Sequence, residues 1–452
     1  MQKEPPKNFE AKPIELEEEI YKPEIQALPS EMPTKVAISP EETSKIFQKV
    51  DEHAMQVSSQ QQDNFNQLIW QLIYARNITD ELEKVRVIFL WLCTKDLHKM
   101  NFDNIKQDSP EEILMGIRTG KSTYAQIFLT LCRYAGLHCK LIVGYAKGAD
   151  YVPGMKFQGR QGEHSWNAVL IEGVWRLIDC HWAARRLIGK EHKPENVRYE
   201  LDMFYFLANP SQLIYTHFPH DNDWQLLHHS INIEEFESLA PVKSMFFKYN
   251  LDLVTHKNAV IQTNAPEFEL RIAFPKGIEE RLLFTFTLSF NDGSEKYNEV
   301  SLLRYGRQEL DFINNHSCFC IRTPIPGSYK LLIYAKLINV EPNVQENDSQ
   351  KMFGAICEYK IDSNFHLKQA LPPFPPCQSS TYGPNEVWQY FIVSSTASIV
   401  SGLPSLQPGY LGPYEPKFSD YGLSTYSHKD PFIVANTGDI CIQLKTTRDK
   451  PI

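Results

Sequence analysis

Residues 164–179 read HSWNAVLIEGVWRLID, and this stretch decides the fold of the amino-terminal half of the chain. Two runs rich in β-branched and aromatic residues, 164–171 and 174–180, flank the pair Glu172-Gly173. A two-residue connection containing glycine between two such runs is typical of a tight β-hairpin. The sequence therefore predicts two antiparallel strands joined by a two-residue turn.

The length of the turn sets the register of this hairpin. With two residues in the turn, Ile171 faces Val174, and counting outward puts Trp166 opposite Asp179. Because side chains alternate between the two faces of a strand, His164 lies one diagonal step from Asp179 on the same face. We expect one face of the hairpin to carry His164, Trp166, Trp175 and Asp179.

Helical patterns precede the hairpin. Residues 78–97 place apolar side chains three and four positions apart, and a second apolar run follows Ser122 and stops at Gly136. A short β segment at 139–145 then leads into the hairpin. Helices followed by strands predict an α+β domain, which we place at residues 46–235.

Strand patterns dominate after about residue 245 and predict an all-β sandwich of the immunoglobulin-like kind at residues 245–363. The runs stand at 268–274, 282–290, 319–323 and 328–337. A linker follows at 364–410, and it contains the proline-rich segment ALPPFPPC at 370–377. We expect this stiff segment to stay outside both cores and to separate modules.

Part of the sandwich sequence recurs 172 positions later in the chain. Seven identities without a gap join the two segments, from Phe246 and Phe418 to Asn264 and Asn436. We interpret residues 411–452 as a partial second copy of the sandwich module. Only 16 residues follow Asn436, too few strands to close a sandwich, which indicates a truncated chain or two strands that pair elsewhere.

Composition limits the class of protein. The first 45 residues hold seven prolines and an acidic run at 17–19, which predicts a disordered tail. A net charge of −9 without a basic block gives no support for nucleic-acid binding. There is no apolar stretch of about 18 residues and no secretory signal pattern, so we expect a cytoplasmic protein without a membrane partner. The nine scattered cysteines predict reduced thiols.

His164 and Asp179 are residue types that papain-like chemistry requires. That chemistry needs a thiolate at a helix start, an imidazole on a neighbouring strand, and a carboxylate or amide that orients the imidazole. The fifteen-residue separation of His164 and Asp179, followed by Trp182, resembles the His and Asp motifs of the transglutaminase-like superfamily.

Further motifs resemble the kyphoscoliosis-peptidase group of this superfamily. They are VGYAKG at 143–148, FYFLANP at 204–210, HFP at 217–219 and WQLL at 224–227. The resemblance covers about residues 46–452 and implies a transglutaminase-like domain followed by immunoglobulin-like modules. It also implies cysteine-peptidase or acyl-transfer chemistry and association with the cytoskeleton.

The chain departs from this family at the nucleophile. In the family a C-x-G-Y pattern opens the core helix, whereas residues 121–124 read KSTY here, so Lys121 takes the position of the cysteine. The nearest downstream cysteine, Cys132, stands almost three helical turns further on, about 15 Å from the helix start. No other thiol is expected to replace the missing one.

Three interpretations of Lys121 and Ser122 remain open. In a pseudoenzyme, which we favour, a protonated lysine replaces the thiolate, and His164 and Asp179 survive as a vestigial structural pair. In an acyl-transfer enzyme, Ser122 would attack an amide carbonyl with His164 as base, although a serine before a helix is by default its N-cap. A lysine nucleophile would need a lowered pKa, for which the local sequence offers no apolar pocket.

Four further residues are candidates for the walls of the cleft, namely Trp166, Asn167, Tyr145 and Trp182. Each also has a structural interpretation. Tryptophans are more often core residues than substrate platforms, Asn167 is a strand-edge residue first, and Tyr145 ends a glycine-containing strand.

The sequence thus predicts a catalytically inactive scaffold that binds other proteins, with cytoskeletal partners implied by the resemblance. The alternative is a peptidase or acyl transferase in which Ser122 acts with His164 and Asp179. We expect no organic cofactor and no metal, because no loop has EF-hand spacing and no second cysteine pair accompanies Cys318 and Cys320.

Overall fold

The computed structural model describes residues 4–15, 40–188, 193–278, 281–311, 314–337, 353–374, 423–425 and 444–446. The chain divides into two compact units, Met1–Glu237 and Ser238–Ile452. Among the described residues, no helix is long and apolar enough to cross a membrane.

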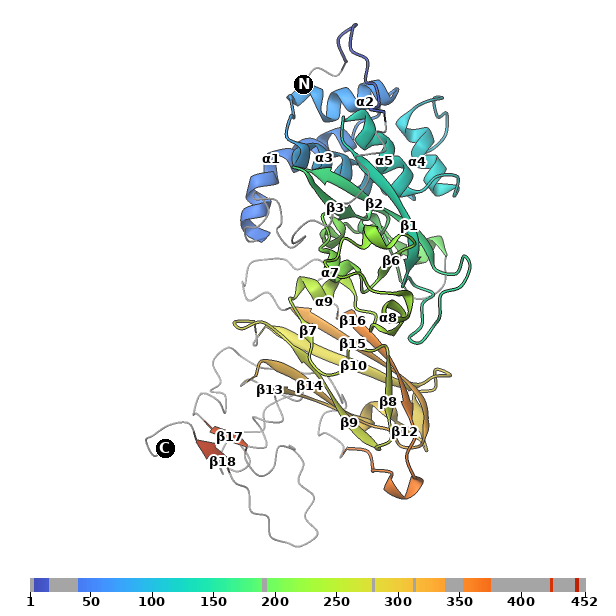
Figure 1. Cartoon of the computed structure of the whole chain (residues 1–452), viewed down its shortest axis with the longest axis vertical. Helices are drawn as coiled ribbons and strands as arrows, with labels where there is room; N and C mark the ends of the chain where they lie inside the picture. The colour runs from blue at the N-terminus through green and yellow to red at the C-terminus, as the bar shows by residue number, and fades with distance from the viewer. Residues whose placement is uncertain are drawn as a thin grey trace. The chain divides into compact units, whose positions relative to one another are not determined.

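The first unit is an α+β domain, as predicted, with helices packed on a small antiparallel sheet (Figure 1). The sheet has the order β3-β2-β1-β6 and consists of β1 (Cys139–Ala146), β2 (Glu163–Ile171), β3 (Val174–Ile178) and β6 (His217–Pro219). The helices are α1 (Pro40–Ser58), α2 (Phe65–Leu72), α3 (Glu81–Cys93), α4 (Pro110–Arg118), α5 (Tyr124–Tyr134), α6 (Cys180–Ala184), α7 (Pro210–Leu213) and α8 (Ile233–Ser238). Short elements are β4 (Arg186–Leu187), β5 (Val197–Arg198), η2 (Tyr74–Arg76), η3 (Pro194–Asn196), η4 (Met203–Tyr205) and η5 (Asn222–Gln225).

Helix α3 forms the centre of this core. Nearly all its side chains from Leu82 to Cys93 are buried, and it packs against α1, α5 and α6. Its start is capped by Asp80, whose carboxylate accepts a hydrogen bond from the N–H of Glu83. From Val85 onward the helix is buried on all sides, as is typical of a central position, and the helix predicted within residues 78–97 is confirmed.

Helix α5 begins one residue later than its sequence suggested. Thr123, not Ser122, is the N-cap, and it forms a capping box with Gln126. The expectation that Ser122 caps the helix is therefore wrong, because the threonine next to it makes the reciprocal pair. The predicted end at Gly136 is confirmed, since this glycine takes the left-handed φ of +73° that ends many helices.

The predicted hairpin has the predicted register. Ile171 pairs with Val174, and Glu172 and Gly173 both have positive φ, as a type I′ turn requires. The third strand, however, ends at Ile178 rather than at residue 180. Asp179 leaves the ladder because its side chain caps α6.

The prediction of a disordered tail is wrong for residues 4–15. Phe9 packs edge-on against Trp70 and Tyr74, with ring centroids 4.9 and 5.0 Å apart. The Asn66 side chain bonds to backbone atoms of Phe9 and Ala11. A single aromatic side chain and backbone pairing hold this segment, which composition alone does not reveal. Residues 16–39 lie outside the described part.

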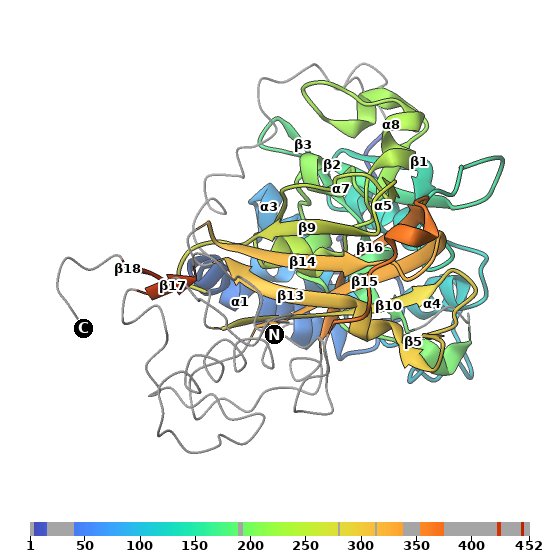
Figure 2. The same ribbon diagram turned by 90° about the horizontal axis from the view of Figure 1, so that it is seen from below.

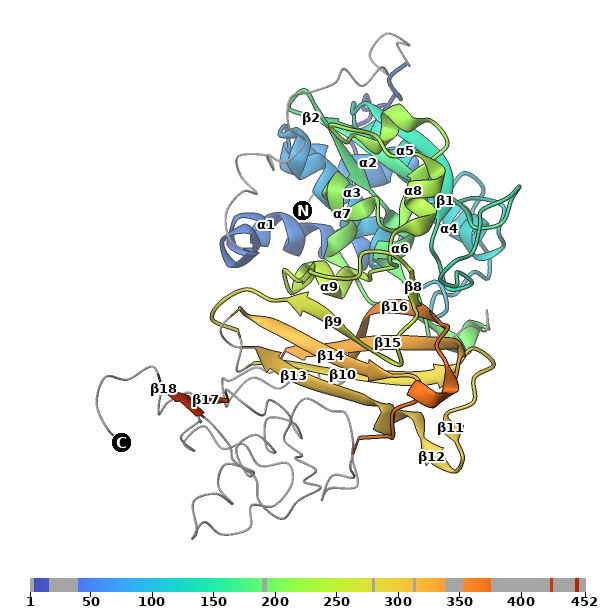
Figure 3. The ribbon, with the colours of Figure 1, turned by 60° about the horizontal axis from the view of Figure 1, so that its bottom comes forward.

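The second unit is the predicted sandwich. Its sheets have the orders β10-β15-β16-β8 and β13-β14-β9-β7. Figure 2 shows β9, β14 and β13 side by side, and Figure 3 shows β15 and β16 of the other sheet next to each other. Phe284 of β10 and Phe319 of β14 contact edge to face with centroids 6.1 Å apart, which joins the two sheets.

The strands are β7 (Asp252–Leu253), β8 (Val260–Thr263), β9 (Glu267–Ala273), β10 (Leu282–Phe290), β13 (Gly306–Asp311), β14 (His316–Arg322), β15 (Gly327–Leu337) and β16 (Gly354–Ser363). Smaller elements are α9 (Ser244–Lys248), β11 (Lys296–Tyr297), β12 (Val300–Ser301), η6 (Leu302–Tyr305) and η7 (Leu367–Gln369).

The start of the predicted linker belongs to the sandwich. Phe374 is only 2% exposed, and its ring packs against the guanidinium of Arg322. The ring centroid lies 3.7 Å from Cζ of Arg322. Its backbone exchanges hydrogen bonds with Arg304. The expectation that the proline-rich segment stays outside both cores is wrong up to this residue, because a phenylalanine among the prolines is buried under arginines. Residues 375–410 lie outside the described part.

The predicted second copy at 411–452 lies almost entirely outside the described residues. Only β17 (Leu423–Thr425) and β18 (Leu444–Thr446) are described, and they pair antiparallel.

Candidate functional site

The site is built around the carboxylate of Asp179, which is fully buried. One oxygen, Oδ1, accepts hydrogen bonds from the N–H groups of His181 and Trp182, at 2.8 and 3.1 Å, and so caps α6. The other oxygen, Oδ2, lies 2.7 Å from Nε2 of His164. The hairpin register thus brings together the His-Asp pair that the sequence predicted.

The same oxygen has a second imidazole partner that the sequence analysis did not propose as a site residue. Nε2 of His217 lies 3.0 Å from Asp179 Oδ2, and the His217 side chain is buried. His217 comes from β6, 38 residues beyond Asp179. It stood in the HFP motif at 217–219, which was the only available signal. We call His164, Asp179 and His217 the His-Asp-His cluster.

A glycine lets β6 reach this position. Strand β1 pairs with β6 on one side and β2 on the other, and Gly144 faces His164 across the ladder. A Cβ atom on Gly144 would lie 2.1 Å from the carbonyl oxygen of Phe218 and 2.8 Å from the Trp166 ring. Only a residue without a side chain permits this close approach.

Aromatic rings surround the cluster. Trp182 lies with its ring centroid 4.5 Å from that of His217 and 5.5 Å from that of His164. Trp166 is buried and packs against both histidines. Both tryptophans therefore lie beside His164, and the His164 side chain retains 11% exposure.

The surroundings set the charge of the cluster. Burial by itself would raise the pKa of Asp179, but His164 and His217 outweigh it and hold the pKa well below its usual range. Burial lowers the pKa of His217, against the opposing effect of its bond to Asp179. Burial, aided by the charges of His164 and Arg185, lowers the pKa of the neighbouring His181 to about 3. At neutral pH the site therefore holds an ionised Asp179 carboxylate, and the imidazoles of His217 and His181 are neutral.

The other two candidate wall residues have structural roles. Asn167 is fully buried, and its amide donates to the carbonyl oxygens of Ala125 and Lys140, which ties α5 to the sheet. Because β2 has neighbours on both sides, Asn167 is not a strand-edge residue. Tyr145 lies on the opposite face of β1 from Gly144 and stacks on Phe157, so the prediction that it lines the cleft is wrong.

The segment at the family's nucleophile position closes α4. The N–H groups of Lys121 and Ser122 both donate to the carbonyl of Gly116, at 2.8 and 3.1 Å. The Ser122 hydroxyl lies against Gly116, where an added Cβ would be 3.0 Å from Oγ. The Lys121 side chain is exposed. Among the described residues, no hydrogen bond joins Ser122 to His164.

The four cysteines of this unit, Cys93, Cys132, Cys139 and Cys180, are all buried. Burial raises the pKa of Cys93, Cys132 and Cys180, so none of these thiols ionises readily near neutral pH. The predicted reduced state holds for the seven described cysteines, which are all free.

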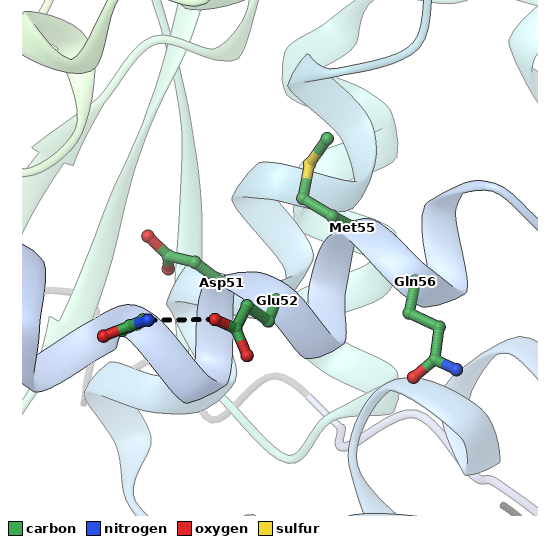
Figure 4. A pocket seen from close by; sticks show the side chains of 5 residues that line it. Asp51, Glu52, Met55 and Gln56 are labelled. Carbon is green, nitrogen blue, oxygen red and sulfur yellow. Dashed lines mark hydrogen bonds between the residues drawn. The ribbon is translucent and has the colours of Figure 1, made fainter.

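A separate hollow lies on α1 and contains no residue of the cluster (Figure 4). It is lined by Gln48, Asp51, Glu52, Met55 and Gln56. Gln48 donates a hydrogen bond to Glu52, and Asp51 is paired with Arg86 of α3. These polar side chains already have partners within the fold, so the hollow offers no evident chemistry.

Comparisons with known proteins agree with this arrangement. The profile of the transglutaminase-like superfamily matches residues 73–180, and that of the KY-like, immunoglobulin-like domain matches residues 233–375. Hillarin of Drosophila melanogaster is 36% identical over 386 residues, which cover 81% of this chain and 46% of that protein. The Lim and transglutaminase domain protein ltd-1 of Caenorhabditis elegans is 32% identical over 361 residues, 77% of this chain and 48% of that protein. Kyphoscoliosis peptidase of Mus musculus is 27% identical over 328 residues, 71% of this chain and 44% of that protein.

Fold and site together define a transglutaminase-like domain followed by an immunoglobulin-like sandwich. The chain belongs to the KY-like family of transglutaminase-like proteins, as the motifs predicted. It spans a little under half the length of the two relatives described first.

Proposed function

We propose that this chain is a catalytically inactive member of its family that acts as an intracellular protein-binding scaffold, with cytoskeletal proteins as partners. The observation that carries the proposal is the contrast within the site. The His164-Asp179 pair is retained in hydrogen-bonding geometry, while the family's nucleophile position holds the exposed Lys121.

Lysine at this position opposes the chemistry of the family. A thiolate is stabilised at a helix start, where the backbone dipole is positive, and an ammonium there is not. Cys93 and Cys180 cannot substitute for it, since both are buried and their pKa values are raised. Ser122, the alternative nucleophile, bonds through its backbone to Gly116 and makes no hydrogen bond to His164 among the described contacts.

The retained pair has a structural use that explains its survival without catalysis. Asp179 caps α6 and accepts hydrogen bonds from two imidazoles, one of which belongs to β6. Removing any of these groups would leave another buried polar atom without its partner.

The relatives suggest the kind of partner. Proteins named cytokinesis protein 3 from Schizosaccharomyces pombe and Saccharomyces cerevisiae match 44% and 51% of this chain at 25% and 24% identity. Immunoglobulin-like sandwiches commonly serve protein contacts, and the proposed partners place the chain in the cytoplasm.

The test restores the nucleophile. Purified wild type, Lys121→Cys and Lys121→Cys/His164→Ala are treated with a thiol-directed peptidyl electrophile, and wild type and Ser122→Ala with a fluorophosphonate. We expect no site labelling of the wild type, fast labelling of Lys121→Cys, and slow labelling of the double variant, because His164 would activate the new thiol. Fluorophosphonate labelling of the wild type that disappears in Ser122→Ala would instead establish an active serine site.

The scaffold role is tested in cells that express tagged full-length chain. If binding rather than catalysis is the function, wild type and His164→Gln should sediment equally with the detergent-insoluble cytoskeletal fraction. Loss of this association only in His164→Gln, with its folding intact by circular dichroism, would contradict the proposal. Absence of the wild type from that fraction would contradict the cytoskeletal assignment.

A further inference from the structure

The His-Asp-His cluster has the composition of a metal site. Nε2 of His164, Nε2 of His217 and an oxygen of Asp179 all lie within 4.8 Å of one another. We propose that these three atoms bind a divalent transition-metal ion of the zinc class. This inference does not depend on the scaffold role proposed above.

The spacing of the three atoms is close to what an ion requires. Zinc bonds of about 2.1 Å in a tetrahedral site separate neighbouring ligand atoms by about 3.4 Å. Asp179 Oδ2 lies 2.7 Å from His164 Nε2 and 3.0 Å from His217 Nε2. Shifts of less than about 1 Å in each of these two separations would reach the tetrahedral spacing. The His164 side chain is 11% exposed, so a solvent molecule can reach the fourth position from its side.

Hydrogen bonds from neighbouring groups orient two of the proposed ligands, Asp179 and His217. Asp179 Oδ1 is occupied by two backbone N–H groups, which leaves Oδ2, the oxygen that faces both imidazoles, to bind the ion. Nδ1 of His217 lies 2.9 Å from the hydroxyl of Thr216, and that hydroxyl lies 3.2 Å from the carbonyl oxygen of Leu213. Such outer hydrogen bonds fix the tautomer of metal-binding histidines.

This hydrogen-bond chain permits the tautomer that a metal needs. Without an ion, His217 donates its Nε2 proton to Asp179, and its Nδ1 accepts from the Thr216 hydroxyl. When the Thr216 hydroxyl donates to Leu213 instead, Nδ1 carries the proton and Nε2 offers its lone pair to an ion between the imidazole and the carboxylate. The ion would take the place of the Nε2 proton, and the carboxylate cancels half of the charge of a dication.

The ligand types select the class of ion. Two imidazoles and one carboxylate suit zinc, cobalt or nickel, whereas calcium and magnesium prefer oxygen ligands. In a cysteine enzyme the same histidine must exchange a proton with the thiolate, so metal binding would compete with catalysis. With Lys121 at the nucleophile position, His164 is free of that demand.

The experiment measures zinc binding to the full chain after removal of metals with EDTA. Two exposed histidines could also chelate a metal ion, because Nδ1 of His228 lies 3.1 Å from Nε2 of His229. Every sample therefore carries His228→Ala and His229→Ala. Isothermal titration with Zn²⁺ and visible absorption with Co²⁺ report stoichiometry and coordination. We expect one ion per chain, and a tetrahedral Co²⁺ spectrum.

Variants of the ligands decide the assignment. In this background, His164→Gln and His217→Gln should abolish binding, while the control His220→Gln, an exposed histidine outside the cluster, should leave it unchanged. Thr216→Val keeps all three ligands and the shape of the side chain, and it should weaken binding about tenfold or more through the loss of orientation. This variant remains informative if a ligand variant fails to fold.

Two results would overturn the proposal. One is an absence of stoichiometric zinc binding to the background protein. The other is binding that persists unchanged in folded His164→Gln or in Thr216→Val, which would place the ion elsewhere.

Discussion

The two parts of the site that the family motifs define differ in this chain: one lies on the hairpin and the other precedes α5. The half on the hairpin, His164 and Asp179, keeps the family's residue types and a 2.7 Å contact. The half before α5 presents the exposed side chain of Lys121 at the position where the sequence predicts the family's nucleophile. The difference lies in what else each half does, because Asp179 also caps α6 and bonds to His217, whereas the Lys121 side chain is exposed. Under the proposed function, the fold requires Asp179 even where the chemistry does not.

The largest expected effect comes from removing the carboxylate. Asp179→Ala deletes the cap of α6 and leaves two imidazoles without their acceptor, so we expect a loss of about 3–5 kcal/mol in the free energy of unfolding. Urea denaturation followed by tryptophan fluorescence measures it. Lys121→Ala is the matched control and should change stability by less than about 0.5 kcal/mol. Equal effects of the two variants would remove the basis of the comparison.

Acid should weaken the hairpin half through His181. Its pKa is about 3 when folded against 6.5 for the ordinary group, so between these values the unfolded state binds more protons and stability falls as pH falls. From about pH 7 to pH 5 we expect a loss of about 2 kcal/mol from this group. Denaturant titrations at both values test it. The His181→Phe variant should flatten the dependence, and an unchanged slope would contradict the assignment.

At the start of α5, the neighbouring residues Ser122 and Thr123 should differ in their contribution to stability, because only Thr123 caps the helix. Thr123→Ala should cost about 1 kcal/mol because it removes the hydroxyl that accepts a hydrogen bond from the N–H of Gln126. Ser122→Ala should cost less than about 0.5 kcal/mol, since the Ser122 side chain makes no capping bond. Thermal unfolding of both variants gives the comparison, and a larger effect at Ser122 would show that its hydroxyl has a further role.

The smallest effect concerns the charge at position 121. Replacing Lys121 with Glu should stabilise the protein by a few tenths of a kcal/mol, because a negative charge near a helix start interacts favourably with its dipole. Added salt should reduce the gain, which a melting series with and without about 0.5 M sodium chloride would detect. A loss of stability would mean that the ammonium has a favourable partner in solution.

Much of the site could be predicted because its determinants are local. The two-residue turn at 172–173 sets the register that puts His164 and Asp179 on one face, and no distant contact is needed to place them. The departure at Lys121 is likewise a matter of spacing within a motif. What could not be predicted is that Asp179 leaves its strand to cap α6, because this depends on two backbone N–H groups that only the folded turn presents.

The sequence by itself determined the local elements of this protein: the helix within 78–97, the hairpin and the strands of the sandwich. Their physical basis is short-range, namely side-chain periodicity, turn residues and caps. The tertiary structure alone decided the partners that come from far along the chain: His217 beside Asp179, Phe9 against Trp70, and Phe374 under Arg322. Such contacts depend on which surfaces meet when the elements pack together. The residue pattern of a single segment therefore does not predict them.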